Sequence, residues 1–362
     1  FWLKSLGASP ACAAWGRARA PAAAPRPFGM ALALVVIAGV PAACVLAALA
    51  WRWLKPRPAV AGRTVFVTGG SEGIGKAMGL EFVRRGAHVV LMARTEGKLR
   101  AAVKDLEGAR VDPTQRIGMQ TMDVTDYASV QEGVRLATAA FGAPAFLVTS
   151  AGAAHPGYFL EQEPEVFERS MRLNYMGNVH AIKAVAPLMK DRGGGHVMIV
   201  ASAAAVVSFI GYSSYAPTKF ALRGLADSLR TELNGFGIQV AICYPPDTET
   251  PGFQEENKTK PPETKACFPA DAYPPERVAA QSISSLLTGD YHIQSVDILQ
   301  NLLVSSMAGV TPRSFTLLES LALPLMALAS QPFWMWFDFQ GRRYASRTRG
   351  ESSPGDSGKK DS

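Results

Sequence analysis

The stretch TGGSEGIG, Thr68 to Gly75, lies between the apolar run RTVFV and the amphipathic segment KAMGLEFVRRG. A strand followed by a turn and a helix places this turn at a helix N-terminus, where unpaired N–H groups and a partial positive charge favour anions. Glycines allow the backbone to approach a ligand closely, and Ser71 can donate a hydrogen bond. The stretch therefore predicts a phosphate-binding turn built on Gly69, Gly73 and Gly75.

Apolar strand runs alternate with amphipathic helical segments along residues 60–290. The runs are TVFVTG, HVVLMAR, GMQTMDV, AFLVTSAG, GHVMIVAS and IQVAICYPP. Helical segments of a dozen residues or more separate them, which is typical of a parallel sheet with helices on both faces. We therefore predict an α/β fold, a Rossmann-type doubly wound parallel sheet, in which the phosphate-binding turn is the first strand-to-helix connection.

The formal net charge of +7 is concentrated at the two ends of the chain. Residues 1–29 hold four basic and no acidic side chains, and residues 339–362 hold six basic and three acidic ones, so the stretch between them is neutral overall. A nucleic-acid-binding protein would gather Lys and Arg on its folded domain, so we expect no nucleic-acid partner. The four cysteines lack C-x-x-C spacing and the five histidines lack ligand spacing, which predicts reduced thiols and no metal site.

The ends of the chain differ from the neutral middle. Residues 30–51 are uncharged, long enough to span a bilayer core and followed by WRWLKPRP, so we expect a retained N-terminal membrane anchor. The alternative is a cleaved signal peptide, because the run is Ala-rich and follows basic residues. Residues 1–29 are expected to be disordered or an artefact of gene-boundary assignment, with Met30 as the start. Residues 291–338 are an apolar C-terminal region that either associates with the membrane or caps the domain, and residues 339–362 form a basic tail.

Further motifs follow the turn in a fixed order. TMDV and TSAG end two strand runs, Asn174 lies in LNYMGN, and SSYAPTKF places Tyr215 four residues before Lys219. Ser202 precedes Tyr215 by thirteen residues. With a turn of the form T-G-x-x-x-G-x-G, this order and spacing resembles the short-chain dehydrogenase/reductase family. The resemblance implies a catalytic set of Ser202, Tyr215, Lys219 and Asn174.

Ketone reduction explains why these residue types occur together. Hydride transfer to a ketone creates an alkoxide, which needs a proton from an acid whose pKa lies nearer the working pH than the value of about 10 of free tyrosine. Lys219, one helical turn after Tyr215, is expected to lower the pKa of the phenol. Ser202 is expected to hold the carbonyl oxygen, and by resemblance Asn174 completes a proton relay through water.

The end of the second strand run, VVLMAR, indicates the cofactor. An NAD enzyme usually has a carboxylate there, whereas this chain has Ala93 followed by Arg94, with Lys98 one turn further on. Cations suit a 2′-phosphate, so we expect NADPH. By resemblance, Asp123 contacts the adenine and Thr250 the carboxamide. The full predicted cofactor-binding set is Gly69, Ser71, Glu72, Gly73, Ile74, Gly75, Arg94, Lys98, Asp123, Tyr215, Lys219 and Thr250.

The segment YPPDTETPGFQEENKTKPPETK, Tyr244 to Lys265, follows the sixth strand run and resembles the mobile substrate lid of the family. Together with the anchor, it implies that a membrane-bound reductase acts on a lipid ketone. One alternative is a membrane-bound retinol or hydroxysteroid dehydrogenase. The other is a non-catalytic cofactor-binding scaffold, against which the intact Ser202, Tyr215 and Lys219 argue. The sequence leaves a homo-oligomer open.

The last four residues, Lys359-Lys360-Asp361-Ser362, indicate a location. Lysines at the third and fourth positions from the end resemble the dilysine signal of endoplasmic reticulum membrane proteins, which is read from the cytosol. Basic residues elsewhere in the tail and just after the anchor agree, because positive charge near a membrane helix marks the cytosolic side. We therefore expect the chain in the endoplasmic reticulum membrane, with the bilayer as a partner and the catalytic domain facing the cytosol.

Overall fold

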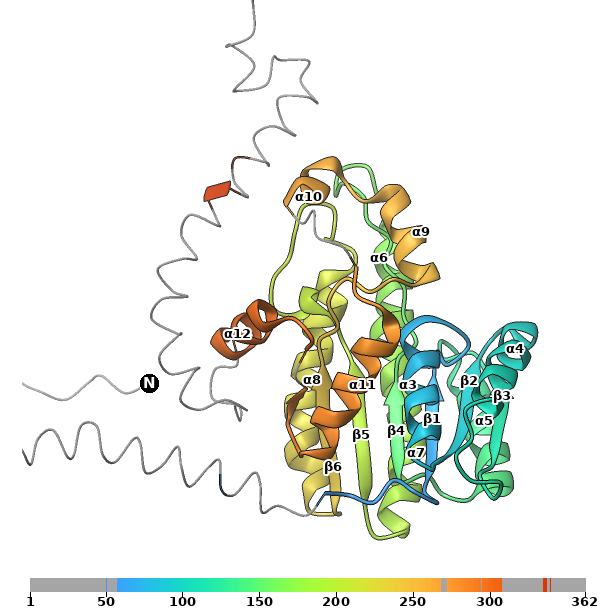
Figure 1. Cartoon of the computed structure of the whole chain (residues 1–362). Coiled ribbons are helices and arrows are strands. Elements are labelled where there is room, and N and C mark those ends of the chain that lie inside the picture. Colours follow the sequence, from blue (N-terminus) through green and yellow to red (C-terminus); the bar gives the residue numbers. More distant parts are fainter. Residues whose placement is uncertain are drawn as a thin grey trace, which may run out of the picture. The chain divides into compact units, whose positions relative to one another are not determined.

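The computed structural model describes residues 50, 57–267, 272–293, 295–307, 335–336 and 339 (Figure 1). The elements named below belong to the compact unit that begins at Arg52. Nearly all of the expected anchor at 30–51 and of the basic tail at 339–362 lies outside the described residues. Among the helices that the structure does describe, none combines the length and the apolar character that crossing a bilayer requires.

The described residues form a seven-stranded parallel sheet in the order β3-β2-β1-β4-β5-β6-β7. The strands are β1 Thr64–Thr68, β2 His88–Ala93, β3 Ile117–Thr121, β4 Phe146–Thr149, β5 Gly195–Val200, β6 Ile238–Cys243 and β7 His292–Ile293. The central strand β1 is buried throughout, because helices cover both faces of the sheet. The predicted doubly wound parallel sheet is confirmed.

Helices connect successive strands and lie on both faces. They are α3 Gly73–Arg84, α4 Glu96–Glu107, α5 Tyr127–Phe141, α6 Pro164–Met171, α7 Gly177–Asp191, α8 Ala216–Asn234, α9 Pro251–Thr259, α10 Pro262–Cys267, α11 Pro275–Leu287 and α12 Ile298–Met307. α3 packs between α4 and α11 on one face, and α5 packs beside α7 on the other (Figure 1).

Each face of the sheet has its own hydrophobic cluster. Phe82 of α3 and Ile283 of α11 are fully buried in one cluster, and Val130 of α5 and Leu222 of α8 are fully buried in the other. Burying a side chain of this size stabilises the fold by about 1.5–3 kcal/mol. The two clusters therefore hold the sheet rigidly between its helical layers.

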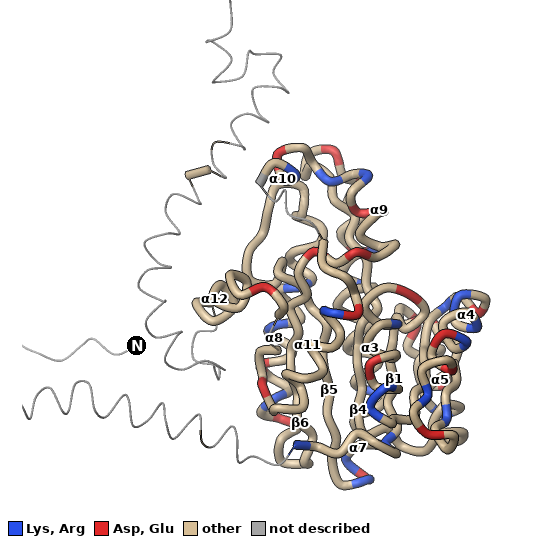
Figure 2. The backbone as a smooth tube through the Cα atoms, in the orientation of Figure 1, with Lys and Arg blue, Asp and Glu red and all other residues tan. Residues whose placement is uncertain are grey.

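All strands are parallel, so their carboxyl ends meet at one edge of the sheet. The chain order reverses between β1 and β4, and a crevice forms at such a point in this class of sheet. α9 and α10 lie beyond this edge, above the body of the domain (Figure 1). Basic and acidic residues are interspersed along α4, α5 and α9 (Figure 2).

The structure adds two elements that the strand pattern did not predict. β7 is only two residues long, too short to show as an apolar run, yet it pairs with β6. α12 lies within the apolar region that begins at residue 291, and Val304 in it is buried against the α5–α7–α8 cluster. The sheet and its covering helices therefore continue past residue 290.

Candidate active site

A cavity of about 1420 Å³ lies at the carboxyl edge of the sheet. Its walls come from the phosphate-binding turn, the loops after β2, β4, β5 and β6, the lid helix α9, and α12. The predicted site residues that line it are Gly69, Ser71, Glu72, Gly73, Ile74, Gly75, Arg94, Lys98, Ser202, Tyr215, Lys219 and Thr250. The structure thus brings together residues that are spread over most of the catalytic domain.

The glycines of the turn allow contacts that no side chain would permit. A Cβ on Gly75 would lie 2.3 Å from the carbonyl oxygen of Gly69, and one on Gly69, whose φ is +65°, would lie 2.7 Å from the backbone nitrogen of Ala151. α3 begins at Gly73, and the side chain of Glu72 does not cap it. The glycines therefore let the turn pack tightly on itself and on the loop after β4, and the start of α3 lines the cavity, which fits the pyrophosphate of a dinucleotide.

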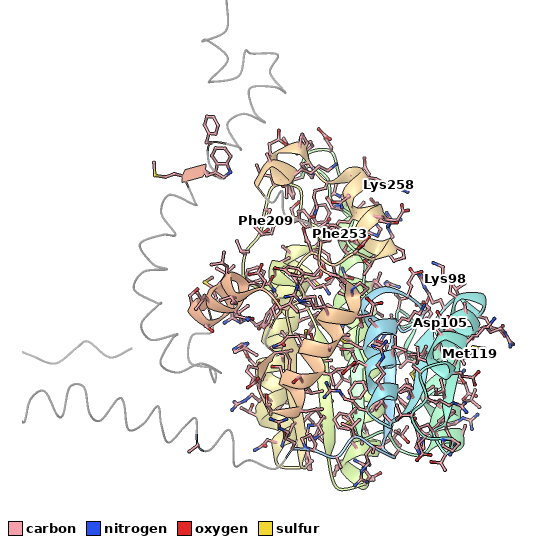
Figure 3. All side chains as sticks on the ribbon, viewed as in Figure 1. Lys98, Asp105, Met119, Phe209, Phe253 and Lys258 are labelled. Atoms are coloured by element: carbon pink, nitrogen blue, oxygen red, sulfur yellow. The ribbon has the colours of Figure 1, made fainter. Side chains whose placement is uncertain are left out.

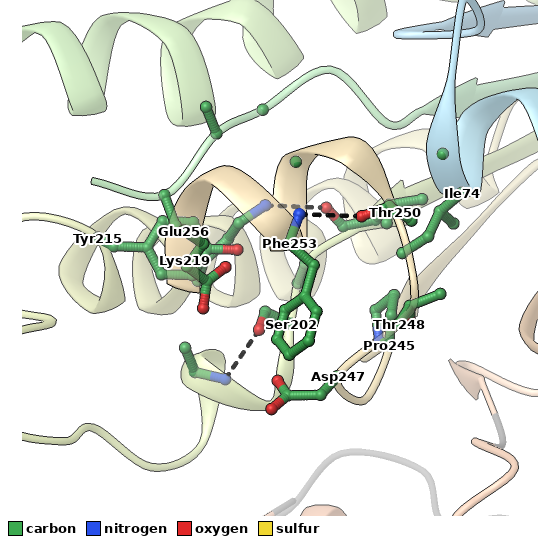
Figure 4. Close-up of a pocket in the computed structure, with 18 of the residues that line it drawn as sticks. Ile74, Ser202, Tyr215, Lys219, Pro245, Asp247, Thr248, Thr250, Phe253 and Glu256 are labelled. Carbon is green, nitrogen blue, oxygen red and sulfur yellow. Dashed lines mark hydrogen bonds between the residues drawn. The ribbon is translucent and has the colours of Figure 1, made fainter. Parts of the chain in front are cut away.

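Tyr215 and Lys219 both lie at the start of α8, and Ser202 lines the same cavity (Figure 4). The ammonium of Lys219 lies 5.4 Å from the centre of the Tyr215 ring and donates to the carbonyl oxygen of Val200 at 3.2 Å. Pro217 falls in the first turn of α8, where its missing N–H breaks no helical hydrogen bond. The proline between the two catalytic residues is therefore tolerated.

Ser202 is fixed by the short 3₁₀ turn that follows β5, Ala203–Ala205. Its Oγ accepts a hydrogen bond from the backbone N–H of Ala204 at 3.2 Å, while the residue itself is extended. The hydroxyl hydrogen is left to point into the cavity, toward a substrate oxygen or toward Tyr215. Ser202 is therefore placed as a hydrogen-bond donor beside the phenol.

Burial dominates the electrostatics of the catalytic pair. It lowers the pKa of Lys219 to about 8. The pKa of Tyr215 is raised, chiefly by burial and next by the carboxylate of Glu256, while a hydrogen bond with Ser202 acts in the opposite direction. The expectation that Lys219 lowers the pKa of Tyr215 is wrong for the net shift, because burial and Glu256 outweigh the favourable contacts.

Asn174 lies in a π-helical turn, Arg172–Met176, between α6 and α7. Such turns are rare and often mark functional sites. The side chain is fully buried; its Oδ1 accepts from the N–H of Ala153 and its Nδ2 donates to the carbonyl oxygen of Ala153, both at 2.9 Å. Asn174 does not line the cavity but braces the loop after β4, and its role in a relay remains a prediction.

The two cations expected at the 2′-phosphate differ in their surroundings. Lys98 donates to Glu72 at 2.7 Å, and this exposed ion pair partly offsets the negative charge that Glu72 brings to the turn. Arg94, at the end of β2, is exposed and makes no ion pair with the described residues. Arg94 is therefore the cation available for a phosphate.

Asp123, which was expected to contact the adenine, does not line the cavity. Its Oδ1 accepts hydrogen bonds from the backbone N–H and the hydroxyl of Thr125.

Sequence reasoning missed a polar cluster under the lid helix α9. Tyr212 donates a hydrogen bond to Glu256, and the ammonium of Lys260 lies 3.3 Å from Glu256 and 3.7 Å from Asp247. Phe253 points from α9 toward the body of the domain, whereas Lys258 points outward (Figure 3). The partners are far apart in the sequence, so the only local sign of this cluster was the pair of acidic residues in QEENK.

Among the described residues no cluster with metal-binding composition occurs.

Residues 63–261 match the family model described as short chain dehydrogenase. The chain belongs to the short-chain dehydrogenase family and is an oxidoreductase that uses a nicotinamide cofactor. A short-chain type dehydrogenase/reductase from Mycobacterium ulcerans has the same fold, with a TM-score of 0.59 and 27% identity over 66% of this chain and 90% of that one. A short-chain dehydrogenase/reductase from Burkholderia phymatum, solved in complex with NAD, gives a TM-score of 0.59 at 21% identity, over 65% of this chain and 89% of that one.

Within this family, the chain is similar to reductases of one lipid ketone. It is 38% identical to the 3-ketodihydrosphingosine reductase of Dictyostelium discoideum, over 74% of this chain and 84% of that protein. It is 40% identical to the 3-dehydrosphinganine reductase of Danio rerio, over 71% of this chain and 79% of that protein. These names describe the same activity, and the similarity extends over 282 and 261 residues respectively.

Proposed function

We propose that this chain reduces 3-ketodihydrosphingosine, also called 3-ketosphinganine, to sphinganine with NADPH, a step of de novo sphingolipid synthesis. The observation behind the proposal is the similarity to reductases with this name, together with an intact Ser202, Tyr215 and Lys219 at one cavity. The substrate is a long-chain 1-hydroxy-2-amino-3-ketone, so the site must hold a polar head and an apolar tail.

The catalytic residues divide the work at the ketone. NADPH, held by the phosphate-binding turn and Arg94, would supply the hydride for the carbonyl carbon. Ser202 donates a hydrogen bond to the carbonyl oxygen and holds it beside Tyr215. As the C=O double bond becomes a single bond, Tyr215 transfers its hydroxyl proton to that oxygen. Lys219, with a pKa of about 8, is mostly protonated at neutral pH and stabilises the phenolate that remains.

An apolar wall beyond the catalytic residues suits the alkyl chain. It consists of Val207 and Phe209 from the loop after β5 and Leu299, Leu303 and Met307 from α12. Leu299 is exposed, so this wall continues from the cavity to the protein surface. A long chain bound here would extend out along α12, which suits a substrate drawn from a membrane.

The preference for NADPH is part of the proposal and rests on Arg94. Arg94 follows the last residue of β2 and lines the cavity. Its guanidinium could donate a charge-assisted hydrogen bond to a 2′-phosphate bound there. No acidic residue occupies the corresponding position on this chain, since Ala93 and Thr95 flank Arg94. Lys98 contributes less, because it is already engaged in an ion pair with Glu72.

The purified chain tests this function directly. We expect oxidation of NADPH, followed by absorbance, when 3-ketodihydrosphingosine is added, and formation of sphinganine by mass spectrometry. NADH should support a slower reaction at the same concentration. A retinal and a 3-ketosteroid serve as competing substrates. Faster turnover of either one than of the sphingoid ketone would contradict the proposed substrate.

We also propose that the chain is held at the endoplasmic reticulum membrane with its catalytic domain on the cytosolic side. The support is the uncharged segment at residues 30–51, the basic residues after it, and the lysine pair Lys359 and Lys360. Protease added to sealed microsomes should then digest both the catalytic domain and an epitope placed after Ser362. Protection of either one would contradict this topology.

A further inference from the structure

The polar cluster under α9 places a carboxylate next to the catalytic tyrosine. Tyr212, which donates its hydroxyl to Glu256, packs edge-on against the ring of Tyr215, with ring centres 6.1 Å apart. Both tyrosines and Glu256 line the cavity (Figure 4), and the carboxylate of Glu256 is near enough to Tyr215 to raise the pKa of its phenol. The carboxylate is therefore close to the position where a bound ketone must lie.

Among the described residues, partners are found for one oxygen of this carboxylate, Oε1. The hydroxyl of Tyr212 donates to Oε1, and the ammonium of Lys260 lies 3.3 Å from the same atom. Oε2 accepts no hydrogen bond from the residues that the structure describes. A carboxylate has room for several donors, so Oε2 can receive one from a molecule in the cavity.

The charges of the cluster do not balance. Asp247 and Glu256 carry two negative charges, and Lys260, held against the ring of Phe253 at 4.7 Å, supplies one positive charge. Within this cluster one negative charge is therefore in excess, while Lys219, 5.4 Å from the centre of the Tyr215 ring, belongs to the catalytic pair and not to the cluster. Alone, the excess charge opposes the reaction, because it weakens Tyr215 as an acid and repels the developing alkoxide. A cation that arrives with the substrate would remove this opposition.

We propose that Glu256 forms an ammonium-binding subsite beside Tyr215, which receives the primary amino group on the carbon next to the ketone. This inference rests on the proposed function, because it assigns a residue to one group of that substrate. The ammonium donates to Oε2 of Glu256, while Ser202 and Tyr215 hold the neighbouring ketone oxygen. Tyr212 and Lys260 fix Oε1 and so orient the carboxylate. A ketone without the amino group leaves the charge unpaired and is disfavoured.

The test compares two ketones with the full-length enzyme and NADPH: 3-ketodihydrosphingosine and the same chain without its amino group, 1-hydroxyoctadecan-3-one. We expect wild type to favour the amino ketone in kcat/KM by about ten- to a hundredfold. Glu256→Gln should lose that preference, because reduction of the amino ketone becomes slower and reduction of the ketone without the amino group becomes faster. Tyr212→Phe keeps the charge of Glu256 and should keep most of the preference.

Glu263→Gln is the matched control. Glu263 is another buried lid carboxylate that accepts from a tyrosine, here Tyr158 at 2.7 Å, but it does not line the cavity. Its substitution should change kcat/KM for both ketones by the same factor. An unchanged preference in Glu256→Gln would overturn the subsite and leave Glu256 as a residue that only holds the lid.

A binding measurement separates this inference from the proposed function. A short-chain homologue of sphinganine should bind wild type more tightly than its N-acetyl derivative, by about tenfold or more, and Glu256→Gln should remove the difference. Equal binding of the two by wild type would overturn the subsite. Failure of wild type to reduce 3-ketodihydrosphingosine would instead overturn the proposed function, whatever the binding result.

Discussion

The phosphate-binding turn and the lid face each other across one cavity, yet they are built by different means. The turn depends on backbone atoms in close approach, such as the position of Gly75 against the carbonyl oxygen of Gly69. The lid depends on side-chain hydrogen bonds between distant segments, such as Tyr158 with Glu263. A backbone cradle tolerates almost no substitution, whereas each polar contact of the lid contributes only about 0.5–1.5 kcal/mol. The turn therefore serves any member of the family, and the lid is free to select the substrate.

The largest effect on turnover is expected at the catalytic tyrosine, which lies between the phosphate-binding turn and the lid. Tyr215→Phe keeps the ring and removes the proton donor, so turnover should fall on the order of 10²-fold or more while NADPH binding is retained. Single-turnover kinetics with fluorescence titration of NADPH measures both quantities. Near-normal turnover would show that another group donates the proton.

The next largest effect is expected when a glycine of the turn is replaced by alanine, and the matching change at a glycine of the lid serves as the comparison. Gly75→Ala places a Cβ against backbone that cannot move aside, so NADPH affinity should fall about a hundredfold, with loss of thermal stability. Gly252→Ala, in α9, meets nothing closer than 3.9 Å and should be nearly neutral in both measurements. Equal effects at the two positions would remove the distinction between a rigid turn and an adaptable lid.

The Arg94→Ala substitution tests the part of the cofactor site that is proposed to bind the 2′-phosphate. The change removes a charge-assisted contact worth about 1.5–3 kcal/mol, so the preference for NADPH over NADH in kcat/KM should fall by roughly ten- to a hundredfold. Lys98→Ala should have a smaller effect, because Lys98 is paired with Glu72. If Lys98→Ala has the larger effect, the assignment of the two cations is reversed.

The smallest effect is expected for a single contact of the lid. Tyr158→Phe breaks the hydrogen bond to Glu263, which should raise KM for the ketone about fivefold and leave NADPH affinity unchanged. Tyr127→Phe, whose hydroxyl makes no hydrogen bond to the described residues, is the control and should match wild type. A loss of NADPH affinity in Tyr158→Phe would mean that the lid and the turn are coupled.

The two regions also differ in how far they could be predicted from the sequence. The glycine spacing of the turn and the spacing of Tyr215 and Lys219 are local, and local geometry places both sets at the cavity. The lid cluster joins residues such as Tyr212 and Glu256, which are 44 positions apart, so no local pattern reports it. The raised pKa of Tyr215 could not be predicted for the same reason, because it comes first from burial and then from Glu256, and both exist only in the folded chain.

Short elements were missed for a different physical reason. β7 contains two residues, so it has no periodicity to detect, and its pairing with β6 is a tertiary property. α12 was read only as part of an apolar stretch, since helices buried on one side and exposed on another resemble membrane-associated segments in composition. In both cases the fold beyond residue 290 depends on contacts with the finished sheet.

The strand order has a consequence for how the chain is made. Val65 in β1 pairs with Val89 on one side and with Phe146 on the other, so one edge of β1 stays open while the ribosome adds the residues between them. Pairing of strands so far apart in the chain is slow and leaves an aggregation-prone edge exposed. We therefore expect the nascent domain to need chaperone protection until β4 has emerged. Mutations that slow translation between β2 and β4 should lower the yield of enzyme without changing its activity per molecule.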